Sequence, residues 1–231
     1  MNDQVWQVLR QMTATAHRDL ELCPRLSRQF QPDYRWDEFL DLLAVMADLY
    51  AGLEAWLAPT LAAQQIGYQP RRDLLLPVMT RPPRAIDCRA LQAAESDAAC
   101  WGALYVIEGS ILGGQVITRR MREHFGSLPD AVVQFYQPYA DPGQQWRHVR
   151  QCLGQALDHR GSDLPLDDMA SIERAAKQTV GLRPARDKMT LDHRGSDLPL
   201  DDLEPHTALQ EAGQSALRTF QHFADGLKYP I

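Results

Sequence analysis

The segment from Leu104 to Ile117 most constrains the fold, because it combines apolar, helix-forming residues with three glycines inside six positions. A glycine inside a helix costs about 0.5–1 kcal/mol relative to alanine, so Gly109, Gly113 and Gly114 together cost about 2–3 kcal/mol. Such a cost indicates that some other group approaches the backbone of this helix closely.

Gly109 and Gly113 lie four residues apart, which leaves a strip without side chains on one face of the helix. A neighbouring helix can cross at such a strip. A flat ligand can also lie there, with Ser110 and Gly114 allowing the helix to bend. Glu108 and Ser110 interrupt the apolar run at its centre, which a pure packing face would not need. The spacing alone leaves both interpretations open.

The rest of the chain shows helical periodicity and no sustained strand alternation, so we expect an all-α fold. Asp33 is a candidate cap for the second helix, and Ser96 or Asp97 for the long glycine-containing helix. The expected helices span residues 2–23, 34–61, 73–79, 97–126, 129–136, 142–157, 170–180 and 206–227.

A single domain over residues 1–231 is expected, because the chain contains no evident linker. Residues 157–168 and 191–202 are the same twelve residues, offset by 34. A twelve-residue unit is too short for a solenoid repeat. We therefore expect a 34-residue insertion, at about 169–202, in the connection before the last helix, since long surface loops cost little closure entropy.

Charge and composition exclude several classes of protein. The formal net charge of −6 argues against a general nucleic-acid binder. No signal peptide or membrane-length apolar run is evident, so we expect a soluble, cytoplasmic protein without a membrane partner. The cysteines show no zinc or redox spacing and are expected to be reduced; they are Cys23, Cys88, Cys100 and Cys152.

His17 on the first helix is followed one turn later by Glu21 and preceded two turns earlier by Arg10. A lone histidine on a helix is most often a surface residue or a satisfied core residue. Metalloproteases also use His-x-x-x-Glu, but the second histidine that they need is absent here. A proline-rich connection at 66–90 carries a group of arginines that we expect to form a solvated face: Arg71, Arg72, Arg81, Arg84 and Arg89.

Three motifs together resemble haem oxygenases, most closely the bacterial type that accompanies bacteriophytochromes. The first is Ala-x-x-His-x-x-x-Glu around His17. The second is the run Tyr-Val-Ile-Glu-Gly-Ser-Ile-Leu-Gly-Gly-Gln from Tyr105 to Gln115, and the third is the pair Thr219-Phe220 in the last helix. The resemblance covers most of the chain outside the expected insertion.

The resemblance implies a multi-helix bundle in which haem lies between an amino-terminal proximal helix and a kinked, glycine-rich distal helix. His17 corresponds to the axial ligand of the haem iron, through a neutral imidazole nitrogen. Glu21 would orient the imidazole or a bound water. Gly109, Gly113 and Gly114 would form the distal wall, where only bare backbone lets a porphyrin lie close.

Further residues are implied to bind haem. The two propionates need cations at the mouth of the pocket, and the resemblance places Arg10 and Arg147 there, with Arg150 as a further candidate. Tyr105 corresponds to a hydrogen-bond donor. Phe220 is expected beside the haem.

The implied activity is oxidative cleavage of haem to biliverdin, carbon monoxide and ferrous iron, with O2 and electrons from an external reductant. Haem is then both substrate and cofactor, and the protein supplies position and electrostatics. Gly109, Ser110 and Gly113 are the expected catalytic positions. Many members carry aspartate where this chain has Ser110, which can hold a water but has no charge. The family implies a ferredoxin or flavodoxin with its reductase as electron donor, and a bacteriophytochrome as a user of biliverdin.

Three alternatives remain open. A non-catalytic haem carrier of the same fold is suggested by Ser110 and by the expected insertion. A helical protein without a ligand would explain the helical periodicity alone. An enzyme of the related thiaminase-like fold is disfavoured, because Cys100 and Cys152 have no recognisable nucleophile context.

Overall fold

The computed structural model describes residues 2–64, 66–79, 81–84, 96–158 and 207–228. These residues form helices and connecting loops without any strand, which confirms the all-α expectation. The elements are α1 (Asn2–Glu21), α2 (Pro24–Arg28), α3 (Trp36–Gln64), η1 (Asp73–Val78), α5 (Asp97–Phe125), α6 (Asp130–Tyr136), α7 (Pro142–Asp158) and α9 (Thr207–Lys228). The helix expected at 170–180 and the expected insertion lie outside the described residues.

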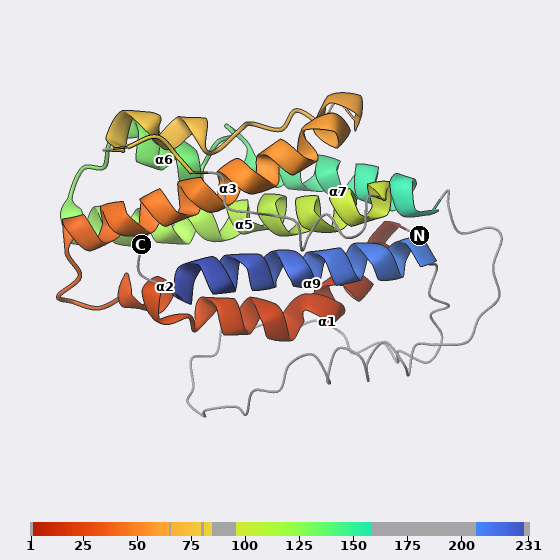
Figure 1. Ribbon diagram of the computed structural model, residues 1–231, viewed down its shortest axis with the longest axis horizontal. Coiled ribbons are helices and arrows are strands. Elements are labelled where there is room, and N and C mark those ends of the chain that lie inside the picture. Colours follow the sequence, from red (N-terminus) through yellow and green to blue (C-terminus); the bar gives the residue numbers. More distant parts are fainter. Residues whose placement is uncertain (1, 65, 80, 85–95, 159–206, 229–231) are drawn as a thin grey trace.

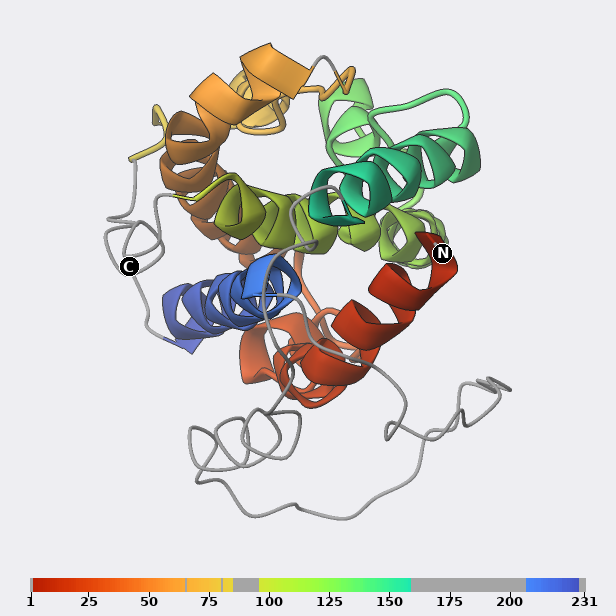
Figure 2. The ribbon, with the colours of Figure 1, turned by 90° about the vertical axis from the view of Figure 1, so that its right-hand side faces the viewer.

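Helix α5 occupies the centre of the bundle, with α3 and α6 above it and α9 and α1 below it in the view of Figure 1. It packs most extensively on α9, and also contacts α7, α6 and α3. Helix α1 packs on α9 and α7 but makes few contacts with α5. Figure 2, seen along the bundle, shows α9 and α7 as the helices that connect the α1 side to the α5 side. The two helices expected to enclose a ligand are thus held mainly through common neighbours.

The two ends of α5 follow from local chemistry. The Ser96 hydroxyl accepts a hydrogen bond from the backbone N–H of Ala99 at 3.1 Å, which confirms Ser96 as the amino-terminal cap. Gly126 ends the helix with φ of 82°, a left-handed value that favours glycine. Among the described residues, α5 is the helix long and apolar enough to cross a membrane by length and composition, and 56% of its most apolar stretch is buried inside the bundle.

The connection from α1 to α3 differs from the expectation. A short additional helix, α2, lies between them. Asp33 does not cap α3, because its carboxylate pairs with the guanidinium of Arg28. The Glu38 carboxylate instead accepts the backbone N–H of Arg35 at 2.9 Å, at the start of α3. Helix α3 includes Pro59 and continues to Gln64, beyond the expected end at 61.

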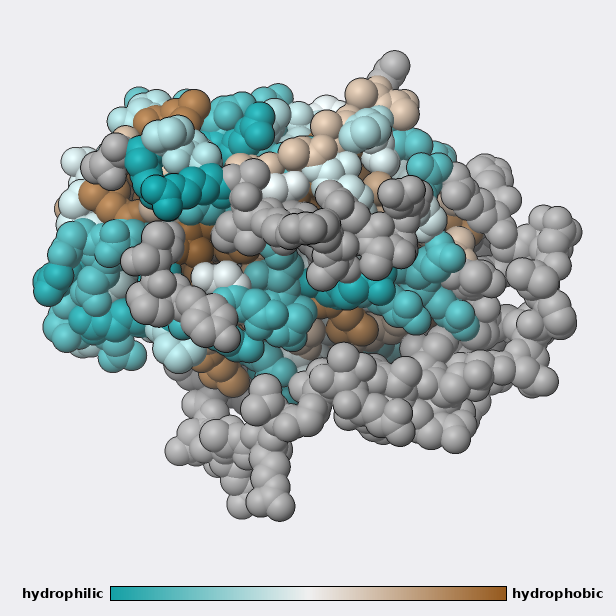
Figure 3. Space-filling view, in the orientation of Figure 1, coloured by the Kyte–Doolittle hydropathy of each residue, from teal (hydrophilic) through white to brown (hydrophobic). Residues whose placement is uncertain are grey.

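Polar and apolar residues are unevenly distributed over the surface of the bundle. In the view of Figure 3 the loop between α2 and α3, at the left, is strongly hydrophilic, whereas apolar residues show in the seam between the upper helices and α9. The loop and the adjoining ends of α2 and α3 carry a dense set of charges, in which Arg28 pairs with Asp33 and Glu38, and Arg35 pairs with Asp37.

Candidate functional site

Helices α1 and α5 approach each other at Thr13 and Tyr105, whose hydroxyl oxygens lie 3.5 Å apart. Both helices run from right to left in Figure 1, so the next turn brings His17 on α1 and Gly109 on α5. Burial raises the pKa of the Tyr105 phenol above its ordinary value. The candidate proximal histidine and the first candidate distal glycine therefore each lie one helical turn past the contact between Thr13 and Tyr105.

The His17 side chain is 57% exposed. Its Nδ1 lies 3.4 Å from a carboxylate oxygen of Glu21, and its ring meets the edge of the Phe220 ring at a centroid distance of 5.5 Å. Phe220 itself is buried, in a small cluster with Val106 and Ala216. With Nδ1 facing Glu21, Nε2 remains as the nitrogen that can bind a metal. The sequence-derived trio of His17, Glu21 and Phe220 is thus brought together.

One face of α5 is apolar and open. Leu112 is 44% exposed and Val116 is 50% exposed, although this helix forms the centre of the core. A Cβ added at Gly113, which lies between them, would meet no atom within 4 Å. Leu112, Gly113 and Val116 share one helix face, and we call them the open strip. An unfilled apolar face on a central helix indicates room for an apolar ligand.

Two other glycines of α5, Gly102 and Gly114, serve packing. A Cβ at Gly102 would overlap the carbonyl oxygen of Ala212 in α9, and a Cβ at Gly114 would overlap the carbonyl oxygen of Tyr136 in α6. The structure therefore gives Gly114 a packing role away from the open strip. At Gly109 a Cβ would make an ordinary contact of 3.5 Å with the Trp146 ring. The helix-packing interpretation is therefore confirmed at Gly102 and Gly114, whereas Gly113 faces open space and its role in binding a ligand stays a prediction.

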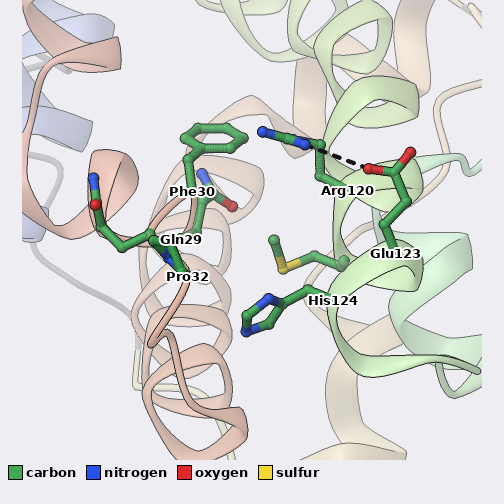
Figure 4. A pocket seen from close by; sticks show the side chains of 8 residues that line it. Gln29, Phe30, Pro32, Arg120, Glu123 and His124 are labelled. Atoms are coloured by element: carbon green, nitrogen blue, oxygen red, sulfur yellow. Dashed lines mark hydrogen bonds and ion pairs between the residues drawn. The ribbon is translucent and has the colours of Figure 1, made fainter.

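A pocket of about 270 Å³ adjoins the carboxyl-terminal part of α5 (Figure 4). One wall comes from the chain after α1 and the other from α5: Gln29, Phe30, Gln31 and Pro32 face Arg120, Met121, Glu123 and His124. Arg120 lies seven residues after Gly113, two turns along the same face as the open strip. The connection between α2 and α3 and the helix that carries the open strip therefore form opposite walls of this pocket.

Two candidate propionate-binding arginines share one aromatic ring. The guanidinium carbon of Arg10 lies 5.3 Å from the centroid of the Trp6 ring, and that of Arg150 lies 4.4 Å from it. Both distances are within the range of cation–π attraction. Arg147 is exposed and approaches Gly143 near the start of α7 instead. Trp6, which joins α1 to α7, is a residue that the sequence motifs did not reveal.

A buried ion pair lies behind Ser110. The side chains of Arg71 and Glu108 are 3% and 0% exposed, with Nη2 of Arg71 2.9 Å from Oε1 of Glu108. Nη1 of Arg71 donates to the Ser110 hydroxyl at 2.9 Å and to the Tyr50 hydroxyl at 2.7 Å. The Ser110 hydroxyl donates in turn to the carbonyl of Ile107 at 2.7 Å. The expected solvated face is therefore wrong for Arg71.

Other groups hold the ion pair in place. The second carboxylate oxygen of Glu108 accepts from the Gln145 side chain at 3.2 Å, and Tyr139 donates to the first oxygen at 3.4 Å. Glu54 accepts from the backbone N–H of Arg71 and from the Tyr68 hydroxyl, each at 2.6 Å. Burial raises the pKa of Glu54 above its ordinary value. The segment that carries Arg71 is consequently anchored at its backbone as well as its side chain.

Comparison with known proteins supplies an independent observation. A protein named "Heme oxygenase" from Xanthomonas campestris pv. campestris (strain 8004) is 35% identical to this chain over 125 residues. The match spans 52% of this chain and 74% of that relative. No model of a known protein family matches the chain.

Proposed function

The chain belongs to the haem oxygenase family, and from this premise we propose that it binds haem between α1 and α5 and cleaves it oxidatively to biliverdin, carbon monoxide and ferrous iron. The reaction uses O2 and electrons from an external reductant. Haem is the substrate, so its iron arrives with it and supplies the oxygen chemistry.

The observation that carries the proposal is the open strip of α5 beyond the contact between Thr13 and Tyr105. Leu112 and Val116 offer apolar side chains, and Gly113 leaves bare backbone between them. A porphyrin is flat and apolar over most of its area, so it suits a face of this kind. Burial of this exposed apolar area in contact with haem would contribute favourably at roughly 25 cal/mol per Å².

His17 supplies the axial nitrogen in this proposal. Its imidazole is exposed rather than packed into the core, and Glu21 lies beside Nδ1. The carboxylate favours the tautomer with the proton on Nδ1, which leaves the Nε2 lone pair for iron. The edge contact with Phe220 limits rotation of the ring.

The propionates bind at the mouth near Trp6. Arg10 and Arg150 converge on the Trp6 ring from α1 and α7. Guanidinium groups bind carboxylates through charge-assisted, bidentate hydrogen bonds. Arg147 lies one turn before Arg150 on α7 and provides a further cation. Tyr105 lies on the α5 side of the same region, and its ring centroid is 5.9 Å from that of Trp146.

On the distal side the chain offers backbone at Gly109 and Gly113 and the hydroxyl of Ser110. The absence of a side chain at Gly113 gives O2 room beside the haem plane. Ser110 supplies the nearest side-chain hydroxyl to these glycines in sequence and holds ordered water. Orientation and water placement, rather than covalent chemistry, are the protein's contribution.

The proposal extends to partners and place of action. Reducing equivalents come from a small ferredoxin or flavodoxin with its reductase, and biliverdin passes to a user such as a bacteriophytochrome. The reaction takes place in the cytoplasm.

Turnover of haemin tests the proposal directly. The purified protein receives one equivalent of haemin and then a ferredoxin reductase system in air, with catalase present to remove free peroxide. We expect the Soret band to decay, a broad band to grow in the red, and carbon monoxide to be trapped by added ferrous myoglobin. Stable haem without carbon monoxide release would contradict the proposal.

A haem carrier is the second candidate, and one observation favours it. The Ser110 hydroxyl proton is engaged with the Ile107 carbonyl, and position 110 carries a hydroxyl in place of a carboxylate. Under this alternative the same experiment gives a stable oxygenated spectrum. Ser110→Asp is then the first substitution to test for gain of turnover.

A further inference from the structure

The guanidinium of Arg71 links the core of the bundle to the candidate distal pocket. It is buried, yet its Nη1 reaches the hydroxyl of Ser110, a residue that is exposed on α5. Arginine remains protonated at all ordinary pH values and can only donate hydrogen bonds. The hydroxyl oxygen of Ser110 therefore accepts a hydrogen bond from a permanently positive group.

This charge is balanced from the opposite side. Glu108 accepts Nη2 of Arg71 at 2.9 Å, and its side chain is 0% exposed. The hydrogen-bonded order is thus the Ser110 hydroxyl, the Arg71 cation and the Glu108 carboxylate. Because Arg71 and not Glu108 is hydrogen-bonded to the Ser110 hydroxyl, the pair presents its positive end to Ser110.

We propose that Arg71 is a positioning residue of the haem site, which polarises the Ser110 hydroxyl so that the distal pocket favours an anionic ligand on the haem iron. A cation hydrogen-bonded to the oxygen strengthens the O–H of Ser110 as a donor. When that O–H turns from the Ile107 carbonyl toward the pocket, it donates to a ligand that bears negative charge. The pair thereby takes the place of the charged side chain that Ser110 lacks.

Tyr50 belongs to the same arrangement. Its hydroxyl accepts Nη1 of Arg71 at 2.7 Å and lies 3.4 Å from the Ser110 oxygen. The guanidinium also lies over the Tyr50 ring, at 5.2 Å from its centroid. These contacts fix the orientation of the guanidinium plane, so that Nη1 is directed to Ser110.

The inference rests on the proposed binding of haem, and its test uses ferric haem with fluoride as a probe anion. The variants are Glu108→Gln, which removes only the carboxylate charge, and the double variant Arg71→Met with Glu108→Gln, which removes both charges without orphaning either. Each is also combined with Ser110→Ala. Fluoride Kd and the pH midpoint of the transition from bound water to bound hydroxide are read from the visible spectrum.

A purely structural role for the pair predicts that both changes act alike. The proposal predicts opposite signs. Glu108→Gln leaves the cation unbalanced, so fluoride should bind at least about threefold more tightly and the water transition should move to lower pH. The double variant should bind fluoride at least about fivefold more weakly and raise that midpoint. With Ser110→Ala, the difference between the two backgrounds should shrink strongly, since the effect passes through this hydroxyl.

The inference about Arg71 would be overturned if the two variants changed the fluoride Kd in the same direction. It would also be overturned if the difference between them stayed undiminished with Ser110→Ala. Either result would leave haem binding established. If the double variant does not fold, the comparison of Glu108→Gln with Glu108→Gln plus Ser110→Ala decides: the gain in fluoride affinity must disappear. If the unaltered protein fails to bind haemin, the proposed function falls and this inference falls with it.

Discussion

The hydroxyl oxygen of Thr13 lies 3.5 Å from that of Tyr105, and this contact joins α1 to α5 one turn before His17 and Gly109. Thr13 donates its own proton to the carbonyl of Leu9 at 2.7 Å, so Tyr105 is the donor between the two hydroxyls. This contact therefore sets the separation between α1 and α5 at the point where the candidate haem site begins.

Replacing His17 by alanine should abolish the low-spin spectrum of the ferric haem complex and leave the fold intact. The side chain is 57% exposed, so its removal creates no cavity, and the unfolding free energy should change by less than about 0.5 kcal/mol. Visible absorption and circular dichroism measure the two effects. The control is His148→Ala, an exposed histidine on α7, which should keep the spectrum of the unaltered protein. An unchanged spectrum in His17→Ala would remove this residue as the ligand.

Replacing Gly113 by leucine should block haem without weakening the protein. No atom lies within 4 Å of an added Cβ there, and leucine is a better helix former than glycine by about 0.8 kcal/mol. The melting temperature should therefore stay level or rise, while haemin affinity should fall at least about tenfold from overlap with the ligand. Fluorescence quenching by haemin and thermal melting give both values.

The matched control for Gly113→Leu is Gly114→Ala. Its Cβ would overlap the carbonyl oxygen of Tyr136, so the substitution should destabilise the fold by about 1–3 kcal/mol. Haemin binding at a temperature where the variant is folded should be much less affected than in Gly113→Leu. The reverse pattern, with Gly114 sensitive to haem and Gly113 sensitive to heat, would mean that the open strip is not the haem face.

Replacing Trp6 by leucine should weaken binding of the haem propionates, because Arg10 and Arg150 both lose their cation–π partner. We expect haemin Kd to rise by about threefold to tenfold. Haemin dimethyl ester has no propionate charges, so its Kd should change little. Loss of affinity for both compounds to the same degree would show that Trp6 acts through packing alone.

Acid should loosen the loop between α2 and α3. Hydrogen bonds from Arg28 hold the pKa values of Asp33 and Glu38 below their ordinary values of 3.8 and 4.5. A lowered folded pKa means that this contribution is fully present above the ordinary values and is lost as pH falls below about 4 through the folded values. In Arg28→Ala the fall in melting temperature between pH 5 and pH 3 should be shallower than in the unaltered protein. A parallel fall in both proteins would assign the acid sensitivity to other carboxylates.

Much of the fold follows from local signals. Periodicity gave the long helices, and Ser96 marks the start of α5 because its hydroxyl caps the helix with a contact three residues away. The errors arise where local rules meet tertiary contacts. Asp33 is of a residue type that often caps helices, but its carboxylate forms an ion pair with Arg28 instead. Helix α3 continues to Gln64, beyond its expected end at 61.

The candidate site was only partly visible in the sequence. His17 and Glu21 are one turn apart, and their spacing alone indicated that they meet. Arg71 was misread because its partner Glu108 is 37 residues away in sequence, and no pattern of spacing reveals such a pair. Trp6 was missed for the same reason, since Arg150 reaches it from another helix.

The glycines of α5 differ in what holds them in place over evolutionary time. Gly102 and Gly114 are confined by neighbouring main chain, so any lineage that keeps this bundle must keep them. Gly113 meets no such demand, and helix propensity favours its replacement. Under the proposed function, a descendant that no longer bound haem would therefore lose Gly113 early and retain the other two. The residue at position 113 would therefore indicate whether selection for haem binding continues.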